Sequence, residues 1–274
     1  MSKYDFKKTI HALVVFLILA IILFPVYWMV SASLKTDNEI FSIPPIWLWK
    51  PTLQSYIYTI EKAGMPRALL VSLIVTGGSI LLGLLVSAPA AYGIARFNFK
   101  GRKEIWFWYV TNWMLVPMVV LIPFYLVASK LNLINNPILL ILIFQVFVVP
   151  LMVWLLVDQF RSIPIVLEEA AKLDGLNRLG IFLRISLPLT KPGIVVAMIL
   201  SAIFAWNDLL YAFILMPGQH ERTASTIAIA YLGGYLIPWS KVMASGVMIC
   251  APVVIAGVII HKHIARGLTL GAVK

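Results

Sequence analysis

Long runs without charged residues dominate this sequence. Six runs carry at most one charged residue each, at about residues 9–34, 68–95, 105–129, 131–157, 192–215 and 242–260. A helix needs roughly 20 apolar residues to cross about 30 Å of hydrocarbon. Lipid cannot satisfy backbone hydrogen bonds, so the spanning segments must be helices. The pattern predicts an all-α membrane protein with six transmembrane helices.

The composition excludes a soluble globular fold. The 274 residues are 61% hydrophobic and 12% charged, and their mean hydropathy is +0.96. Soluble domains average about 45–50% apolar and about 25% charged residues. The net charge of +11 would suggest nucleic acid in a soluble protein. Here basic loops on one side of a membrane explain the charge, and no nucleic-acid partner is expected.

The distribution of basic residues predicts an orientation. Fifteen of the 22 Lys and Arg residues lie near the two termini, after the second run, and between the fourth and fifth runs. Six spans place these segments on one side, and the positive-inside rule makes that side the cytoplasm. We therefore expect both termini in the cytoplasm and one transmembrane domain over residues 1–274, with residues 158–191 as a cytoplasmic loop.

Motifs for ATP hydrolysis and metal binding are missing from the sequence. Gly175 and Gly180 are followed by Ile181 and Phe182, whereas a phosphate-binding P-loop needs Lys and Ser or Thr there. No His, Cys and Glu cluster has the spacing of a metal site. Asp208 is the only acid well inside an apolar run, which is too little for a proton relay. We expect no catalytic residue, no metal, and a motor on another subunit.

The cytoplasmic loop has its own helical pattern. Ser162 is a candidate helix cap, Pro164 suits a first turn, and Gly175 can end the helix. Ala170 and Ala171 are predicted to share a small face that allows another backbone to approach closely. The alternative is an amphipathic helix lying on lipid. The mixed charges of this loop favour protein docking.

The same loop resembles the EAA motif of ABC importer permeases. Glu169-Ala170-Ala171 is followed by Gly175 and, after nine residues, by Ile185-Ser186-Leu187-Pro188. In that family the loop forms coupling helices that fit a cleft on the ATPase subunit. The resemblance implies ATPase-coupling roles for Glu168, Glu169, Ala170, Ala171, Asp174, Gly175, Leu187 and Pro188.

Two further segments resemble the six-span second permease of maltose- and trehalose-type importers. They are Phe204 to Asp208 and the end of the chain from Arg266 to Lys274. In those systems the tail reaches between the ATPase subunits. The resemblance implies that the cytoplasmic tail, residues 263–274, contacts the ATPase through Gly267, Leu268, Thr269 and Gly271. A frayed terminus is the alternative.

The resemblance also implies an architecture and partners. It implies a type I ABC importer permease bundle in the inner or cell membrane of a bacterium or archaeon, forming half of a sugar pathway. The expected partners are a second homologous permease in a heterodimer, two ATPase subunits, an extracytoplasmic sugar-binding protein and the lipid bilayer. This chain would hold no cofactor, because ATP and Mg would bind the ATPase.

Polar and aromatic residues within the spans are candidates for the substrate pathway. They are Asn112, Gln145, Trp206, Asn207, Asp208 and Tyr211. The alternative role is hydrogen bonding between helices. A di- or oligosaccharide such as maltose or trehalose is the expected solute, since the spans lack basic residues that would face an anion. The alternatives are glycerol phosphate or its diesters, or a membrane scaffold that binds an ATPase without transport.

Overall fold

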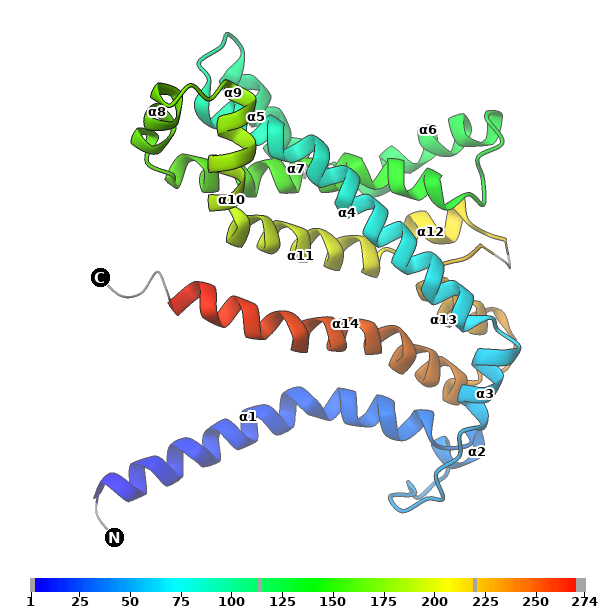
Figure 1. Ribbon diagram of the computed structural model, residues 1–274. Helices are drawn as coiled ribbons and strands as arrows, with labels where there is room; N and C mark the ends of the chain where they lie inside the picture. The colour runs from blue at the N-terminus through cyan, green and yellow to red at the C-terminus, as the bar shows by residue number, and fades with distance from the viewer. Residues whose placement is uncertain (1–2, 113–114, 219–220, 270–274) are drawn as a thin grey trace. The chain divides into compact units, whose positions relative to one another are not determined.

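The computed structural model describes residues 3–112, 115–218 and 221–269, and Figure 1 shows its helices. Helices form the regular structure of these ranges and no strand occurs in them, which confirms the predicted all-α fold. The chain folds as two compact units, Met1–Pro66 with Ile227–Val258 and Arg67–Thr226 with Ile259–Lys274. The single domain expected from sequence is thus distributed over two units.

The first unit is built around two long helices, α1 (Lys3–Ser33) and α14 (Trp239–Thr269). Residues 11–28 of α1 are exposed all round, as a helix in lipid can be. The short helices α2 (Asp37–Ile40) and α3 (Gln54–Glu61) follow α1. Polar contacts hold this end together: Asp37 Oδ1 accepts a hydrogen bond from the Ser240 amide at 2.8 Å, and Lys241 Nζ lies 3.8 Å from the Tyr58 ring.

The second unit is organised around α7 (Pro137–Ser162), along which α5 (Arg102–Asn112) and α11 (Lys191–Asn207) pack. Most α7 side chains from Leu139 to Phe160 are buried within the chain. The long helix α4 (Met65–Arg96) also approaches α7 closely, because two of its residues are glycines at the contact. A Cβ on Gly78 would lie 2.6 Å from Ile141 Cδ1, and one on Gly83 would lie 2.5 Å from Val148 Cγ1.

The third predicted span is not one continuous helix. Helix α5 is followed by α6 (Pro117–Lys130), and the axes of the two differ by 94°. Pro117 occupies the first position of α6, and Val116 before it is extended (φ −70°, ψ 120°). A proline disfavours the helical conformation in the residue before it, so the chain restarts a helix at this point.

The fourth predicted span begins later than expected, at Pro137 instead of residue 131. Asn132 and Asn135 adopt left-handed backbone angles (φ 54° and 65°), which asparagine tolerates better than most residues. Asn136 Oδ1 then accepts a hydrogen bond from the Ile138 amide at 2.9 Å and caps the helix. A polar turn therefore replaces the first part of the predicted span.

The fifth run, predicted over 192–215, is divided at Asp208. Helix α11 ends at Asn207, and α12 (Leu210–Leu215) follows. Asp208 is extended (φ −64°, ψ 129°), and its Oδ2 accepts a hydrogen bond from the Ala212 amide at 3.1 Å. The aspartate that interrupts the apolar run therefore serves as a local cap for α12.

The tail predicted as separate from the sixth span is continuous with it. Helix α14 runs without interruption from Trp239 to Thr269, beyond the expected end near residue 260. The sequence around Ile264 and Ala265 contains good helix formers and no proline, so nothing ends the helix there.

Among the described residues, four helices are long and apolar enough to cross a membrane. The number rises to six if each of two bent helix pairs counts as one span. One pair is α5 with α6, and the other joins Arg178–Leu189 to α11 with a bend of 75°.

Candidate coupling site

The loop between α7 and α11 folds into two short helical arms. The first arm is α8 (Ile165–Leu173), which begins after Pro164 and is followed by its C-cap residue Asp174. Ser162 does not cap this helix, contrary to the prediction: it is the last residue of α7, and its hydroxyl donates to Gln159 O at 2.8 Å. The residue before a proline favours an extended backbone, so Ile163 separates the two helices. Gly175 follows α8 with φ +85°, as expected for a glycine that ends a helix.

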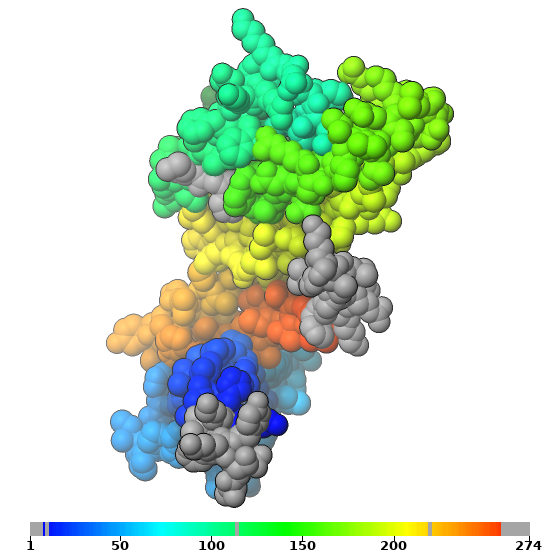
Figure 2. All heavy atoms as spheres, turned by 90° about the vertical axis from the view of Figure 1, so that its left-hand side faces the viewer, coloured from blue at the N-terminus to red at the C-terminus, as the bar shows by residue number. Residues whose placement is uncertain are grey.

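Helix α8 has a buried and an exposed face, and they divide the predicted coupling residues. Glu168 and Ala171 lie three residues apart and are both buried. Glu169, Ala170 and Asp174 are exposed. The predicted small face shared by the two alanines is therefore wrong, because the turn of the helix points Ala171 inward and Ala170 outward. In Figure 2 the yellow-green surface of this segment lies open to the viewer.

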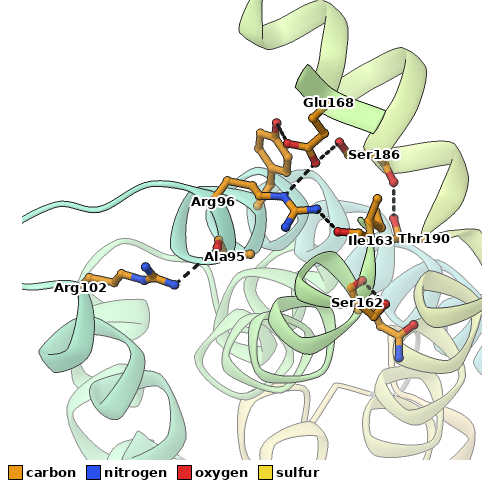
Figure 3. A network of polar contacts seen from close by, with 10 residues as sticks. Ala95, Arg96, Arg102, Ser162, Ile163, Glu168, Ser186 and Thr190 are labelled. Carbon is orange, nitrogen blue, oxygen red and sulfur yellow. Dashed lines mark hydrogen bonds and ion pairs between the residues drawn. The ribbon is translucent and has the colours of Figure 1, made fainter. Parts of the chain in front are cut away.

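The carboxylate of Glu168 is the centre of a polar network (Figure 3). Its Oε1 accepts hydrogen bonds from Arg96 Nε and from Ser186 Oγ, each at 2.8 Å. Its Oε2 accepts a hydrogen bond from the Tyr92 hydroxyl at 3.2 Å. Arg96 and Tyr92 belong to the end of α4, whereas Ser186 lies in the second arm. One side chain of α8 is therefore bonded to two other segments of the unit.

Arg96 links the network to a further segment, because its Nη2 donates to Ile163 O at 2.8 Å, just after α7. The side chains of Arg96 and Glu168 are each only 10% exposed, so this ion pair is largely shielded from water. Removing one member of a buried pair leaves an uncompensated charge, at a typical cost of about 3–5 kcal/mol. The burial of each charge is therefore stabilised by the other.

An aromatic cluster surrounds the ion pair. The Tyr92 ring lies 5.5 Å from the Phe160 ring and 5.0 Å from the Phe182 ring, measured between centroids. These rings come from α4, α7 and the second arm. They reduce the exposure of the carboxylate to water, and hydrogen bonds to charged groups are stronger in such surroundings.

The second arm runs from Arg178 to Leu189 and contains one π-helical turn, Phe182–Ser186, between α9 (Arg178–Ile181) and α10 (Leu187–Leu189). Asn177 Oδ1 caps it by accepting from the Gly180 amide at 2.7 Å. Of the predicted coupling residues here, Leu187 is half-buried and Pro188 is exposed. Thr190 Oγ1 donates to Ser186 O at 3.0 Å, at the bend into α11.

The predicted substrate-pathway residues within the helix bundle are bonded to the chain's own backbone. Asn112 Nδ2 donates to Val146 O, and the Tyr211 hydroxyl donates to Pro117 O at 2.9 Å. Gln145 Nε2 donates to Ile141 O at 2.6 Å and to Ser79 O at 3.3 Å. This geometry agrees with hydrogen bonding within and between helices, the alternative that the sequence left open.

The remaining pathway candidates lie around the end of α11. Trp206 is buried, whereas Asn207 is exposed and donates through Nδ2 to Ile203 O at 2.8 Å. Asp208 is the cap of α12 described above. The six candidates are thus spread over several helix contacts, and the structure does not bring them together into one site.

The predicted tail contacts fall at the end of α14. The backbone of Gly267, Leu268 and Thr269 is helical, and Gly271 lies outside the described residues.

Comparison with known proteins identifies the family. Residues 79–270 match the family model described as the binding-protein-dependent transport system inner membrane component. The match includes α8, the second arm and most of the bundle. The chain belongs to this family of ABC importer permeases. The permease is therefore a membrane-embedded subunit and not an enzyme, as predicted.

Relatives along nearly the whole chain support this assignment. The permease is 32% identical over 273 residues to the trehalose/maltose transport system permease protein MalG of Thermococcus litoralis, with 97% of each chain covered. It is 34% identical to the sulfoquinovosyl glycerol transport system permease protein SmoH of Agrobacterium fabrum, covering 92% of this chain and 89% of SmoH.

A solved structure shares the fold. It is the crystal structure of a bacterial ABC transporter involved in the import of the acidic polysaccharide alginate. The TM-score is 0.73 at 22% identity, with 96% of the permease and 98% of that chain covered. The likeness confirms the predicted permease fold.

Sequence reasoning missed the residues that hold α8 in place. In the sequence, Arg96 is only one of the basic residues that predict the orientation of the permease in the membrane. Tyr92 and Ser186 were not among the predicted site residues. The one available signal was an arginine at the end of an apolar run, in a protein with few acids to pair with it.

Proposed function

We propose that this permease forms half of the translocation pathway of an ATP-driven importer for a neutral di- or oligosaccharide such as maltose or trehalose. The observation that carries the proposal is the fold of the EAA-like loop. Its first helix exposes Glu169, Ala170 and Asp174 while its other face is bonded into the bundle. Such a helix can receive a partner on one side and pass movement to the spans on the other.

The proposed complex contains a second permease, two ATPase subunits that hold ATP and Mg, and an external sugar-binding protein. Both termini and the loop 158–191 face the cytoplasm. Closure of the ATPase dimer on ATP moves α8, and the spans rearrange to open the pathway outward. Because a ligand shifts only equilibria in which it binds the two states differently, ATP must favour the closed ATPase dimer.

The choice of a neutral sugar rests on two observations. MalG, a relative over almost the full length, is named for trehalose and maltose. The sequences of α4 between Arg67 and Arg96 and of α11 after Lys191 contain no basic residue that could pair with an anion. An acidic or sulfonated glycoside is the second candidate, because SmoH is named for sulfoquinovosyl glycerol.

Reconstitution in liposomes tests the function. Vesicles that contain the full complex and ATP should accumulate labelled maltose or trehalose, and excess sulfoquinovosyl glycerol should not compete. Competition by that glycoside without uptake of the neutral sugars would favour the second candidate. ATPase association without uptake of any solute would instead indicate a scaffold.

A bulky residue at Ala170 tests the docking face. Ala170→Trp should abolish co-isolation with the ATPase and reduce uptake, because the indole would hold the partner surface away. Val119→Trp is the control, since Val119 is 66% exposed on α6, outside the loop. Normal co-isolation and uptake with Ala170→Trp would contradict the docking role.

A further inference from the structure

Two adjacent glutamates of α8 have opposite surroundings. Glu168 is buried and accepts hydrogen bonds from Arg96, Ser186 and Tyr92. Glu169 is exposed and forms no ion pair within the part of the chain that the structure describes. A role in contacting a partner therefore fits Glu169, whereas Glu168 is already occupied inside the permease.

We propose that Glu168 and Arg96 form a transmission joint that makes α8 move together with α4 and with the segment entering α11. This inference rests on the proposed function, because it concerns how movement of the ATPase reaches the spans. Glu168 and Arg96 act as positioning residues: they bind neither sugar nor ATP.

The geometry of the joint explains why it transmits movement. Hydrogen bonds to a charged group are directional and about twice as strong as those between neutral groups, so they resist a change in the relative position of donor and acceptor. Both oxygens of Glu168 are occupied by donors from two other segments, at 2.8–3.2 Å. Any displacement of α8 relative to α4 would separate a buried ion pair, so the two helices are favoured to move as one body.

The joint also reaches the segments next to α7 and α11. Arg96 Nη2 holds Ile163 O, at the end of α7. Thr190, which directly precedes α11, donates a hydrogen bond from its Oγ1 to Ser186 O. The 75° bend between the second arm and α11 lies at this point, so rotation of the arm changes the direction in which α11 enters the bundle.

The test uses the complete importer in liposomes, with two separate readouts. One is the amount of ATPase that co-isolates with the permease, and the other is the ratio of ATP hydrolysed to sugar imported. Glu168→Gln keeps the size of the side chain and removes its charge. We expect near-normal co-isolation and a ratio at least roughly fivefold higher, the lower end of typical coupling between sites. Tyr92→Phe, which keeps the ring contacts, should raise the ratio by about twofold.

Glu169→Gln is the matched control, one residue away on the exposed face. It should weaken co-isolation, the readout that Glu168→Gln leaves near normal. If Glu168→Gln folds poorly, the double variant Arg96→Gln with Glu168→Gln replaces it, because it leaves no unpaired charge. The double variant should show the same raised ratio in the complexes that form.

Two outcomes would overturn the inference, and a third concerns only the proposed function. A wild-type ratio in Glu168→Gln or the double variant would show that the pair does not transmit movement. Loss of complex with an unchanged ratio would show that the pair only stabilises the fold. If the wild-type permease never co-isolates with an ATPase, the proposed function fails instead.

Discussion

At the scale of single residues, close contacts in the second unit depend on the absence of a side chain. Gly83 of α4 faces Val148 and Gln145 of α7, at distances that leave no space for a methyl group. Gly77 lies on the same helix with no atom within 4 Å of where a Cβ would be. The two glycines look equivalent in the sequence, and only the packing distinguishes them.

Gly83→Ala should destabilise the permease by about 1–3 kcal/mol, the usual cost of adding a methylene to a packed interface. Gly77→Ala should be neutral or stabilising by about 0.5–1 kcal/mol, because alanine favours a helix. Thermal unfolding of the purified protein in detergent measures both. Equal effects of the two substitutions would show that α4 and α7 do not pack at Gly83.

Glu39 in the first unit provides a residue-scale test of pH dependence. The Thr36 amide and hydroxyl each donate to Glu39 Oε2 at 2.9 Å, and these bonds lower the pKa of Glu39 from its ordinary value of 4.5. A lowered pKa in the folded state stabilises α2 above the ordinary pKa, and this contribution is lost as the pH falls through the lowered value. Thr36→Val should raise the pKa of Glu39, as measured by titration of that carboxyl group. An unchanged pKa would show that the hydroxyl is not bonded to Glu39.

At the scale of helices, prolines, asparagines and a glycine determine where elements end. Pro117 separates α5 from α6, Asn136 begins α7, and Gly175 ends α8. The apolar runs predicted where the helices lie but not where they end. A helix end depends on individual capping residues, and hydropathy does not identify these. Gly175 was an exception: its role in ending the helix was predicted from the sequence, and its φ of +85° agrees.

Gly175→Ala should destabilise the turn after α8 by about 1–2 kcal/mol, the cost of a left-handed backbone for a residue with a Cβ. Gly175→Asn should cost less, since asparagine tolerates these angles. Hydrogen exchange of the α8 and α9 amides, followed by mass spectrometry, would report faster exchange in the alanine variant. Identical exchange in all three proteins would mean that the turn is not strained.

At the scale of the whole molecule, orientation in the membrane remains a prediction from the distribution of basic residues. It can be tested with single cysteines after the natural Cys250 is replaced by serine. A membrane-impermeant thiol reagent added to intact cells should label Leu48→Cys, in the predicted outer segment, and spare Ala170→Cys. Leu48 is 95% exposed, so access is not limited by packing. The opposite labelling pattern would reverse the proposed topology.

The sequence by itself determined that the protein lies in lipid, that its fold is all-α, and that it belongs to the ABC importer permeases. Lipid requires long apolar helices, so the spacing of charges alone predicts spans, and the EAA-like spacing within one loop predicts a partner. These properties are local, since each depends on residues that are close together in the chain.

Only the tertiary structure decided which face of α8 is available and what holds the other. Glu168 and Glu169 are neighbours with the same chemistry, and local sequence does not assign one inward and the other outward. The choice depends on Arg96 and Ser186, which are 72 and 18 residues away and reach the carboxylate only once α4 and the second arm have packed. A buried charge is stabilised only by partners in space, and for that reason its role follows from the fold and not from the motif.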